Sequence, residues 1–367
     1  MKRSIYLQPT GIFWDRTVPR AIDEAEPNAW RGLPLAGGRL SFAALDILTR
    51  DGPQTKRRTV VLGDAFSGDW GREGLAASDI LEALSAARPR LCGLSLDRPR
   101  IMGIVNVTPD SFSDGGAHAT TQAAIAHALK LAQEGADILD IGGESTRPGS
   151  DAVAVHEELA RVIPVIEGLR RQTDKLISVD TRKAEVMRRA ADAGADILND
   201  VSALTHDPDA LTTAAETGLP IMLMHTRGDP KTMNDDPQYA DVVLDVFDWL
   251  ELRIKACVAA GIPKAKIVAD PGLGFAKHLQ HNVVVMAGLS LYHGLGVPIL
   301  LGASRKKMIG QLCNADDPGD RVPGSLACAI AGAAQGVQIF RVHDVKETKQ
   351  ALEVWRASMA GSETGLA

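Results

Sequence analysis

From Leu91 onward the sequence alternates short apolar runs with longer amphipathic stretches. The apolar runs have the length of buried strands, and they are found at Ile101–Val105, Ile138–Ile141, Leu176–Val179, Ile197–Leu198, Ile221–Met224, Ile267–Ala269, Ile299–Leu301 and Val337–Phe340. The stretches between them have helical periodicity, as in Gln122–Gln133, His156–Arg170, Lys183–Ala193 and Ala240–Ala260. Because a helix usually connects neighbouring parallel strands, the alternation predicts repeated βα units. Eight such units over about 260 residues are the size of a (β/α)8 TIM barrel.

Three of the predicted strands follow a glycine placed where a helix should end, at Gly135, Gly194 and Gly336. Glycine is the preferred residue just after a helix, so these positions favour short αβ turns. A doubly wound open sheet is the alternative architecture. Its usual fingerprint, Gly-x-Gly-x-x-Gly after the first strand, is missing, which favours the barrel.

Every predicted strand is followed by polar or charged residues. A single Asp or Asn after a strand is more often a helix cap or a loop hydrogen bond than a functional group. Here the same position is polar in all eight units, and in a barrel these ends converge on one face. The sequence therefore predicts a shared polar pocket formed by Asn106, Gly142–Arg147, Asp180, Asn199–Asp200, His225, Asp270, Ser304–Lys306, Arg341 and His343.

The predicted pocket has an acceptor-rich half and a cationic half. Asp180, Asn199 and Asp270 suit the edge of a polar heterocycle, because a carboxylate can accept two parallel N–H bonds. The cations are Arg147, Arg305, Lys306, Arg341 and His343.

Two further features of the pocket point to a phosphorylated ligand. The segment 145–150, Ser-Thr-Arg-Pro-Gly-Ser, is a hydroxyl- and glycine-bearing loop suited to phosphate. Asn106 could contribute an oxygen ligand to Mg²⁺. Together the two halves predict a phosphorylated or pyrophosphorylated heterocyclic substrate.

Two long segments resemble the signature segments of the dihydropteroate synthase family: 106–116, Asn-Val-Thr-Pro-Asp-Ser-Phe-Ser-Asp-Gly-Gly, and 142–149, Gly-Gly-Glu-Ser-Thr-Arg-Pro-Gly. Shorter motifs continue the match in order: 178–181, 198–201, 223–225, 270–275, 304–306 and 341–344. The resemblance covers about residues 90 to 360. It implies a transferase that condenses 6-hydroxymethyl-7,8-dihydropterin pyrophosphate with 4-aminobenzoate, giving 7,8-dihydropteroate and pyrophosphate.

The resemblance also implies a role for individual residues. The pterin would be held by Asp180, Asn199, Met224, Asp270 and Lys306. The pyrophosphate would be held by Thr146, Arg147, Arg341 and His343, with Mg²⁺ at Asn106. The aminobenzoate ring would lie between Phe112, Pro148 and Phe275, with Ser304 at its carboxylate. The family further implies a homodimer, which we expect to form through the late helices around Leu326–Ala334 and Val345–Trp355.

Composition and charge restrict the remaining functions. The net charge of −6 argues against a general nucleic-acid binder. The four cysteines are scattered and form no Cys-x-x-Cys pair, which favours reduced thiols. No apolar run approaches the roughly 20 residues of a membrane span, and no signal peptide follows the first basic residues. We therefore expect a cytoplasmic protein that binds small molecules and neither membrane nor nucleic acid.

Residues 1–87 differ from the rest and carry three of the five tryptophans. Two strands are predicted at Phe42–Leu48 and Thr59–Leu62, followed by a helix that Ser78 would cap. No catalytic motif occurs here. We expect a small N-terminal α/β accessory module at 1–87, with the pterin-binding barrel at 88–367.

Two other functions remain compatible with parts of the pattern. A folate-dependent methyltransferase barrel would need the pterin-edge residues but not the segment 145–149. A catalytically silent pterin-binding paralogue need not keep Asn106, Arg147 and Lys306 together. The intact motifs favour a working enzyme. His278 and His281 are spaced like a metal pair, but no third ligand accompanies them, and the roles of Glu144 and Lys277 stay open.

Overall fold

The computed structural model describes residues 5–14, 32–51, 54–62, 74–107, 116–145, 150, 152–228 and 232–361. Eight parallel strands form one sheet in the order β10-β9-β8-β7-β6-β5-β12-β11. An additional parallel bridge between Ala269 and Ile299 brings β10 back to β11 and makes the sheet a nearly closed barrel. The (β/α)8 prediction is confirmed. The strands are β5 (Arg100–Asn106), β6 (Ile138–Gly142), β7 (Leu176–Asp180), β8 (Ile197–Asp200), β9 (Ile221–Met224), β10 (Ile267–Asp270), β11 (Leu300–Leu301) and β12 (Ile339–Val342).

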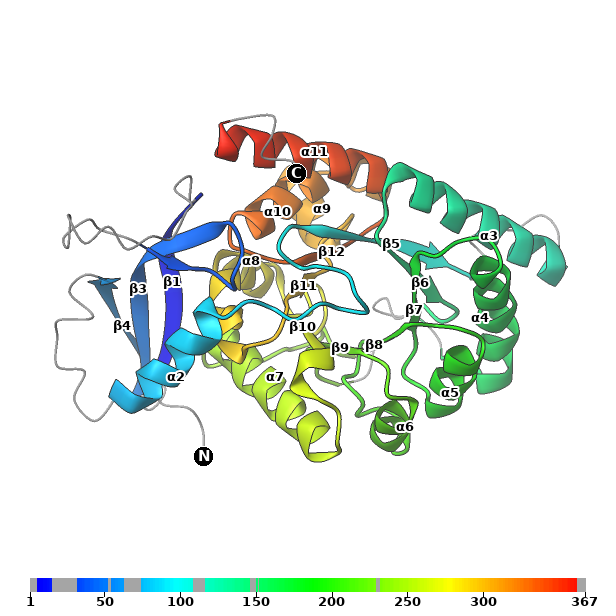
Figure 1. Cartoon of the computed structure of the whole chain (residues 1–367), viewed down its shortest axis with the longest axis horizontal. Helices are drawn as coiled ribbons and strands as arrows, with labels where there is room; N and C mark the ends of the chain where they lie inside the picture. The colour runs from blue at the N-terminus through cyan, green and yellow to red at the C-terminus, as the bar shows by residue number, and fades with distance from the viewer. Residues whose placement is uncertain are drawn as a thin grey trace.

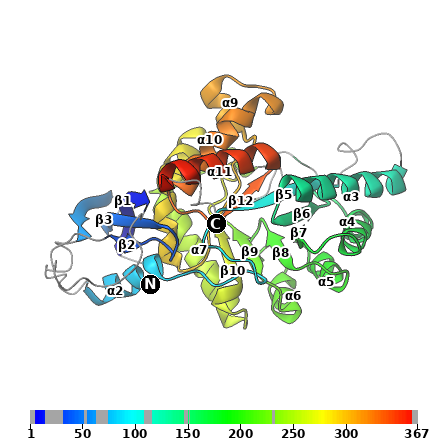
Figure 2. The same ribbon diagram turned by 45° about the horizontal axis from the view of Figure 1, so that its top comes forward.

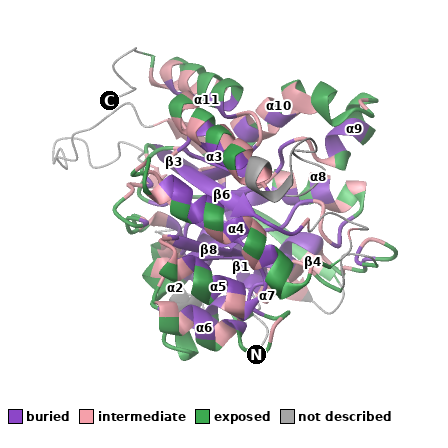
Figure 3. Ribbon diagram, turned by 90° about the vertical axis from the view of Figure 1, so that its right-hand side faces the viewer, coloured by how far each residue is buried: buried purple, intermediate pink, exposed green. Residues whose placement is uncertain are grey.

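Helices surround the strands, with their exposed faces outward (Figures 1 and 3). Each helix packs its apolar face on the outer side of the sheet, so these faces are buried. The strands therefore lie at the centre of the barrel. The helices are α3 (Gly116–Glu134), α4 (Val155–Arg170), α5 (Ala184–Asp192), α6 (Ala210–Thr217), α7 (Val242–Ala259), α8 (Leu279–Ala287), α9 (Lys307–Cys313), α10 (Val322–Ala333) and α11 (Val345–Ala360). The 3-10 turns η3 (Lys264–Lys266), η4 (Leu289–Leu295) and η5 (Pro318–Arg321) complete the connections.

The barrel interior is apolar toward the N-terminal ends of its strands, where one residue from every strand contributes to a single layer. This layer packs against Leu91, Leu94 and Leu96, which precede the first barrel strand, and it consists of Met102, Ile138, Leu176, Ile197, Met222, Val268, Leu300 and Ile339. Because side chains alternate between the two faces of a strand, residues two positions further along also face the interior. In chain order these are Ile104, Asp140, Ser178, Asn199, Met224, Asp270, Gly302 and Arg341. The interior therefore changes from apolar to polar within one layer.

Within its described residues, the N-terminal module consists of an antiparallel sheet and a helix, as expected for a small α/β unit. Its strands are β1 (Ile5–Trp14), β2 (Leu33–Pro34), β3 (Leu40–Asp51) and β4 (Gln54–Val61), and its helix is α2 (Gly74–Ser85). Strand β3 pairs with the other three. The two predicted strands are confirmed as β3 and β4. The prediction that Ser78 caps the helix is wrong, because Ser78 lies inside α2.

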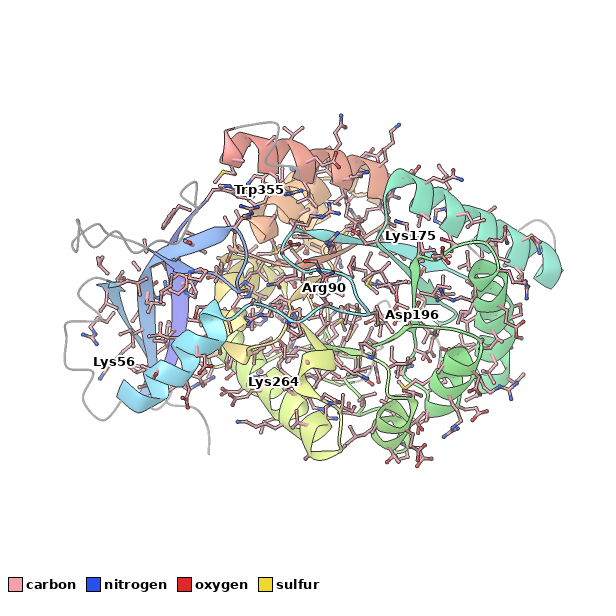
Figure 4. The ribbon with its side chains drawn as sticks, in the orientation of Figure 1. Lys56, Arg90, Lys175, Asp196, Lys264 and Trp355 are labelled. Carbon is pink, nitrogen blue, oxygen red and sulfur yellow. The ribbon has the colours of Figure 1, made fainter. Side chains whose placement is uncertain are left out.

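The module lies against the barrel beside η4 and α7, as Figure 1 shows. It has its own apolar core, which includes Leu7, Phe42 and Leu45, whereas Tyr6 and Leu48 join the large core of the barrel. Trp14 meets Trp355 of α11 edge to face, with ring centroids 6.0 Å apart; Trp355 is labelled in Figure 4. Figure 2 shows α11 from a second direction, together with α9 and α10.

Candidate active site

Within the polar layer of the barrel interior, one arginine bridges two carboxylates and so links three strands. Arg341 on β12 donates from Nε to Asp140 Oδ2 at 2.6 Å and from Nη2 to Asp180 Oδ2 at 2.7 Å. Asn199 on β8 donates to the same Asp140 oxygen at 3.2 Å. These contacts cross the barrel between strands that are not neighbours in the sheet. Three of the residues predicted to form a pocket, Asp180, Asn199 and Arg341, therefore meet in one place.

Asp140 joins this cluster but was not predicted. It lies inside the apolar run Ile138–Ile141 and is completely buried. Its position two residues after the inward-facing Ile138 would have placed it in the interior. An acid within an otherwise apolar strand was the signal that could have identified it.

One acid of the cluster, Asp180, has an unusual protonation equilibrium. Burial raises the pKa of Asp180 to about 7, with Arg341 opposing the shift and the nearby acids Asp140 and Asp200 adding to it. Arg341 is half-buried; desolvation lowers its pKa, but the two carboxylates outweigh this effect and hold the pKa above its ordinary value. Asp180 Oδ1 is buried and has no hydrogen-bond partner within the described residues. A ligand N–H would satisfy this oxygen.

A second acid and a lysine lie beside this cluster. Asp270 ends β10, and its Oδ1 accepts a hydrogen bond from the Gly272 amide at 2.7 Å. Burial raises its pKa, which Lys306 lowers. Lys306 donates to the Leu273 carbonyl, and its Nζ lies 4.4 Å from the centre of the Phe275 ring. Burial lowers the pKa of Lys306 to about 8.

Ser304 and His343 form a third part of the same face. Ser304 follows β11, and its Oγ lies 3.0 Å from His343 Nδ1 and accepts from the His343 amide at 3.2 Å. Met224 ends β9 and is 4% exposed. Asn106 ends β5 and is partly exposed. The predicted residues Phe112, Thr146, Arg147 and Pro148 lie outside the described residues.

Two polar residues after strands take no part in the cluster. Asp200 accepts from Ser202 and from the Leu204 amide, so it caps its own loop. His225 is completely buried and packs against Trp249 of α7, with ring centroids 5.0 Å apart. Each is one residue out of phase with the inward-facing Asn199 or Met224. The alternation of side chains along a strand therefore separates them from the polar layer.

Glu144 supports the loop that follows β6. Its carboxylate accepts from Arg182 Nε at 3.0 Å and from the Val153 amide at 2.9 Å, and it lies 3.2 Å from Lys183 Nζ. Lys183 also pairs with Glu158. Glu144 therefore has cationic partners for its charge and ties the end of β6 to the backbone at Val153. The sequence left the role of Glu144 open, and these contacts give it a structural role beside the loop after β6.

The chain matches the model of the family described as pterin binding enzyme over residues 102–343. The Escherichia coli K12 dihydropteroate synthase is 51% identical over 270 residues, which cover 74% of this chain and 95% of that protein. The chain belongs to the dihydropteroate synthase family of pterin-binding enzymes. Members of this family are transferases. The family model begins at residue 102, so the N-terminal module lies outside the match.

Solved structures of this family support the same assignment. A dihydropteroate synthase of Xanthomonas albilineans with 4-aminobenzoic acid is 54% identical, has a TM-score of 0.71 and covers 75% of this chain and 99% of that one. The same enzyme in complex with 7,8-dihydropteroate is 50% identical, with a TM-score of 0.67 and coverage of 74% and 99%. A Yersinia pestis dihydropteroate synthase with a sulfonamide drug complex is 51% identical, with a TM-score of 0.69 and coverage of 72% and 96%.

Proposed function

We propose that the chain joins 6-hydroxymethyl-7,8-dihydropterin pyrophosphate to 4-aminobenzoate, and that the polar layer of the barrel binds both parts of the pterin substrate. The observation that carries this proposal is Arg341, which bridges Asp140 and Asp180 beside a buried Asp270. Donors and acceptors for a heterocycle thus lie next to a cation that can face a phosphate. The family assignment supports the reaction, and this cluster supports the proposed location of the pterin substrate.

Asp180 and Asp270 would hold the pterin with Asn199, Met224 and Lys306. The Asp180 oxygen without a partner can accept from the ring, and Asp270 retains one carboxylate oxygen outside its bond to Gly272. Both acids would also stabilise positive charge that develops on the pterin methylene as the leaving group departs. Lys306 would balance Asp270 and stay close to the Phe275 ring.

Departure of pyrophosphate is the step that needs the most help, because the amine of 4-aminobenzoate is a weak nucleophile. Arg341 and His343, together with Thr146 and Arg147, would hold the leaving group and stabilise its growing charge. The amine then attacks the methylene carbon, the C–O bond to pyrophosphate breaks, and the amine loses a proton. No side chain is required as a covalent nucleophile.

The aminobenzoate would lie beside Phe275, with Phe112 and Pro148 on its other sides and Ser304 at its carboxylate. Ser304 and His343 are in contact, so the carboxylate end and the phosphate end of the site share a hydrogen-bonded pair. This pairing supports an arrangement in which the two substrates would lie side by side, as their joining requires.

Asn106 fits a magnesium ligand. It is a partly exposed amide at the end of β5, and it makes no hydrogen bond through its side chain within the described residues. Mg²⁺ is usually bound by one or two protein oxygens together with water and substrate phosphate, so one amide oxygen suits it. When bound, the ion would neutralise charge on the pyrophosphate.

We also propose a cytoplasmic homodimer in which residues 1–87 are an accessory module and residues 88–367 form the catalytic barrel. The described cysteines are all free, which supports a reducing compartment. None of the helices within the described ranges is long and apolar enough to cross a membrane. Leu312 on α9 and Val354 on α11 are 57% and 65% exposed and suit a dimer face. Trp355 of α11 instead contacts Trp14 of the N-terminal module.

The direct test combines purified protein, the pterin pyrophosphate, 4-aminobenzoate and Mg²⁺. We expect equal amounts of 7,8-dihydropteroate and pyrophosphate, with inhibition by a sulfonamide that competes with 4-aminobenzoate. Binding of the pterin without product would contradict the proposed function and favour a silent paralogue.

A further inference from the structure

The loop between β10 and α8 carries two proposed site residues, Asp270 and Phe275, in an unusual backbone conformation. Gly272, Gly274 and Ala276 all have positive φ, at 69°, 80° and 49°. A Cβ on Gly272 would lie 2.0 Å from the His225 carbonyl oxygen, so the loop is packed closely against the end of β9. Left-handed conformations are costly for a residue such as Ala276, and they persist where the surrounding contacts impose them.

Those contacts come mainly from one buried side chain. Lys277 is 4% exposed, and its Nζ donates to the carbonyls of Gly272 at 2.9 Å and Phe275 at 3.1 Å. The same Nζ lies 2.9 Å from Nδ1 of His225. His225 in turn donates its backbone N–H to the Asp270 carbonyl at 2.9 Å. Lys277 thus connects both ends of the loop to the neighbouring strand.

Neighbouring residues hold the carbonyls that Lys277 does not reach. The Tyr239 hydroxyl donates to Ala276 at 2.8 Å, and Lys306 donates to Leu273 from the substrate side. Asn282 binds the Lys277 carbonyl at 3.1 Å. The two lysines therefore bind different carbonyls of the loop: Lys306 binds that of Leu273, and Lys277 binds those of Gly272 and Phe275.

We propose that Lys277 is a positioning residue whose amino group, with His225, fixes the loop so that Asp270 and Phe275 face the two substrates. This inference rests on the proposed function, which assigns those two residues to the substrates. It gives a role to two buried basic groups that the reaction itself does not use.

The contacts of Lys277 also fit an uncharged amine. A neutral amine has two N–H donors, which match the two carbonyls, and one lone pair, which can accept from His225 Nδ1–H. His225 Nε2 has no partner within the described residues, and an unprotonated nitrogen tolerates this better than a buried N–H would. Burial lowers the pKa of Lys277 well below its ordinary value; Asp270 opposes this shift, while Lys306 and Arg227 add to it. Burial likewise lowers the pKa of His225.

A neutral Lys277 would hold the loop without adding a second cation next to Lys306. Asp270 then has one charged lysine partner, and its affinity for N–H donors of the pterin is preserved. The titratable groups facing Lys277 are His225, Asp270, Lys306 and Arg227.

The test replaces Lys277 by methionine, which keeps the length of the side chain and removes the donors. Loss of two hydrogen bonds to carbonyls should raise KM for 4-aminobenzoate and for the pterin pyrophosphate by about tenfold or more, with a smaller change in kcat. The acid limb of the kcat/KM profile should not move, because no charge near Asp270 is lost. Lys277→Arg, which introduces a permanent cation, should not restore KM.

Lys266→Met is the matched control, since Lys266, the last residue of η3, also donates to a carbonyl, that of Gly218, at 2.6 Å. It should leave both KM values unchanged. Unchanged KM values in Lys277→Met, or a shifted acid limb, would overturn the inference. If Lys277→Met fails to fold, Tyr239→Phe removes a single contact of the same loop and should raise KM more weakly; an unchanged KM there would equally overturn it.

Binding of 7,8-dihydropteroate, measured by calorimetry, separates this inference from the proposed function because it needs no turnover. A wild-type protein that makes no product contradicts the proposed function. Weaker product binding in Lys277→Met than in Lys266→Met would still support the positioning role, and equal binding would overturn it.

Discussion

Arg341 and Arg50 each bridge a pair of aspartates, one inside the barrel and the other where the N-terminal module meets α7. Arg341 joins Asp140 and Asp180 in the barrel interior. Arg50 of the N-terminal module joins Asp245 and Asp248 of α7, at 2.8 and 3.3 Å, and also donates to the Tyr6 hydroxyl at 3.1 Å. The local chemistry is nearly the same, but the surroundings differ.

The partners of Arg50 are complete without a ligand. Tyr6 donates to Asp248 at 2.7 Å and packs edge to face on Phe247, so the group is a closed network between module and barrel. The interior pair instead leaves a buried Asp180 oxygen without a partner. The comparison teaches that an arginine–aspartate cluster is a candidate site when it retains unsatisfied groups, and a structural tie when it does not.

The largest effect should come from Arg341→Ala. It removes a cation proposed to stabilise the departing pyrophosphate, so we expect kcat/KM to fall by about a thousandfold. Steady-state release of pyrophosphate measures this. Arg50→Ala, the matched change at the other bridge, should keep activity within about twofold. Similar losses in both variants would remove the distinction between them.

The aspartates provide the next comparison. Asp180→Asn replaces an acceptor proposed for the pterin, and loss of hydrogen bonds to a charged group should lower kcat/KM for the pterin substrate by about a hundredfold. Asp248→Asn changes the corresponding acid of the Arg50 network, which lies on α7, and should leave kcat/KM almost unaltered. Pterin affinity, measured by calorimetry, checks whether the loss is in binding. Unaltered affinity in Asp180→Asn would contradict the assignment.

The pH dependence of kcat/KM should be bell-shaped. Asp180, with a pKa of about 7, becomes a full acceptor as the pH rises through that value, and Lys306, with a pKa of about 8, loses its charge above it. Asp180→Asn should remove the rising limb, and Lys306→Arg should remove the falling limb. Because the pKa of Asp180 is raised by folding from 3.8, its contribution to the free energy of unfolding also decreases as the pH rises from about 4 to about 7.

The smallest effect on activity, but a measurable one on stability, should come from Arg50→Met. Breaking this partly buried network should lower the free energy of unfolding by about 2 kcal/mol. Arg57→Met is the control, because Arg57 is 60% exposed and lies 3.5 Å from Asp46; an exposed pair contributes about 0 to 1 kcal/mol. Thermal unfolding of the two variants checks this, and equal shifts would show that the Arg50 network does not hold the module.

Much of the barrel could be predicted from the sequence because strands buried on both faces are continuous apolar runs. Ile221–Met224 has the same bounds as β9, and the other barrel strands differ from their predicted bounds by at most two residues at either end. Strand β1 was missed because Gln8, Pro9, Thr10 and Gly11 interrupt its apolar pattern. It forms all the same because β3 pairs with it along nearly its whole length.

The clustering of polar residues was predictable where a residue's position at the end of a strand is enough to place it, as for Asp180, Asp270 and Arg341. Whether a residue at a strand end faces the interior depends on its phase within the strand, and the phase is set by pairing across the barrel. This is why His225 and Asp200 were placed with the pocket and Asp140 was not. The amino group of Lys277 bonds to its own loop and to His225, which is 52 residues away in the chain, so no local pattern could reveal the contact with His225.

The central claim is that one polar layer binds the pterin ring on one side and the pyrophosphate on the other. A crystal structure with pterin pyrophosphate and Mg²⁺ tests it most directly. We predict that Asp180 and Asp270 accept from ring N–H groups while Arg341 contacts a phosphate oxygen. A pterin bound away from Asp180 and Asp270, with Arg341 still tied only to its two aspartates, would contradict the account.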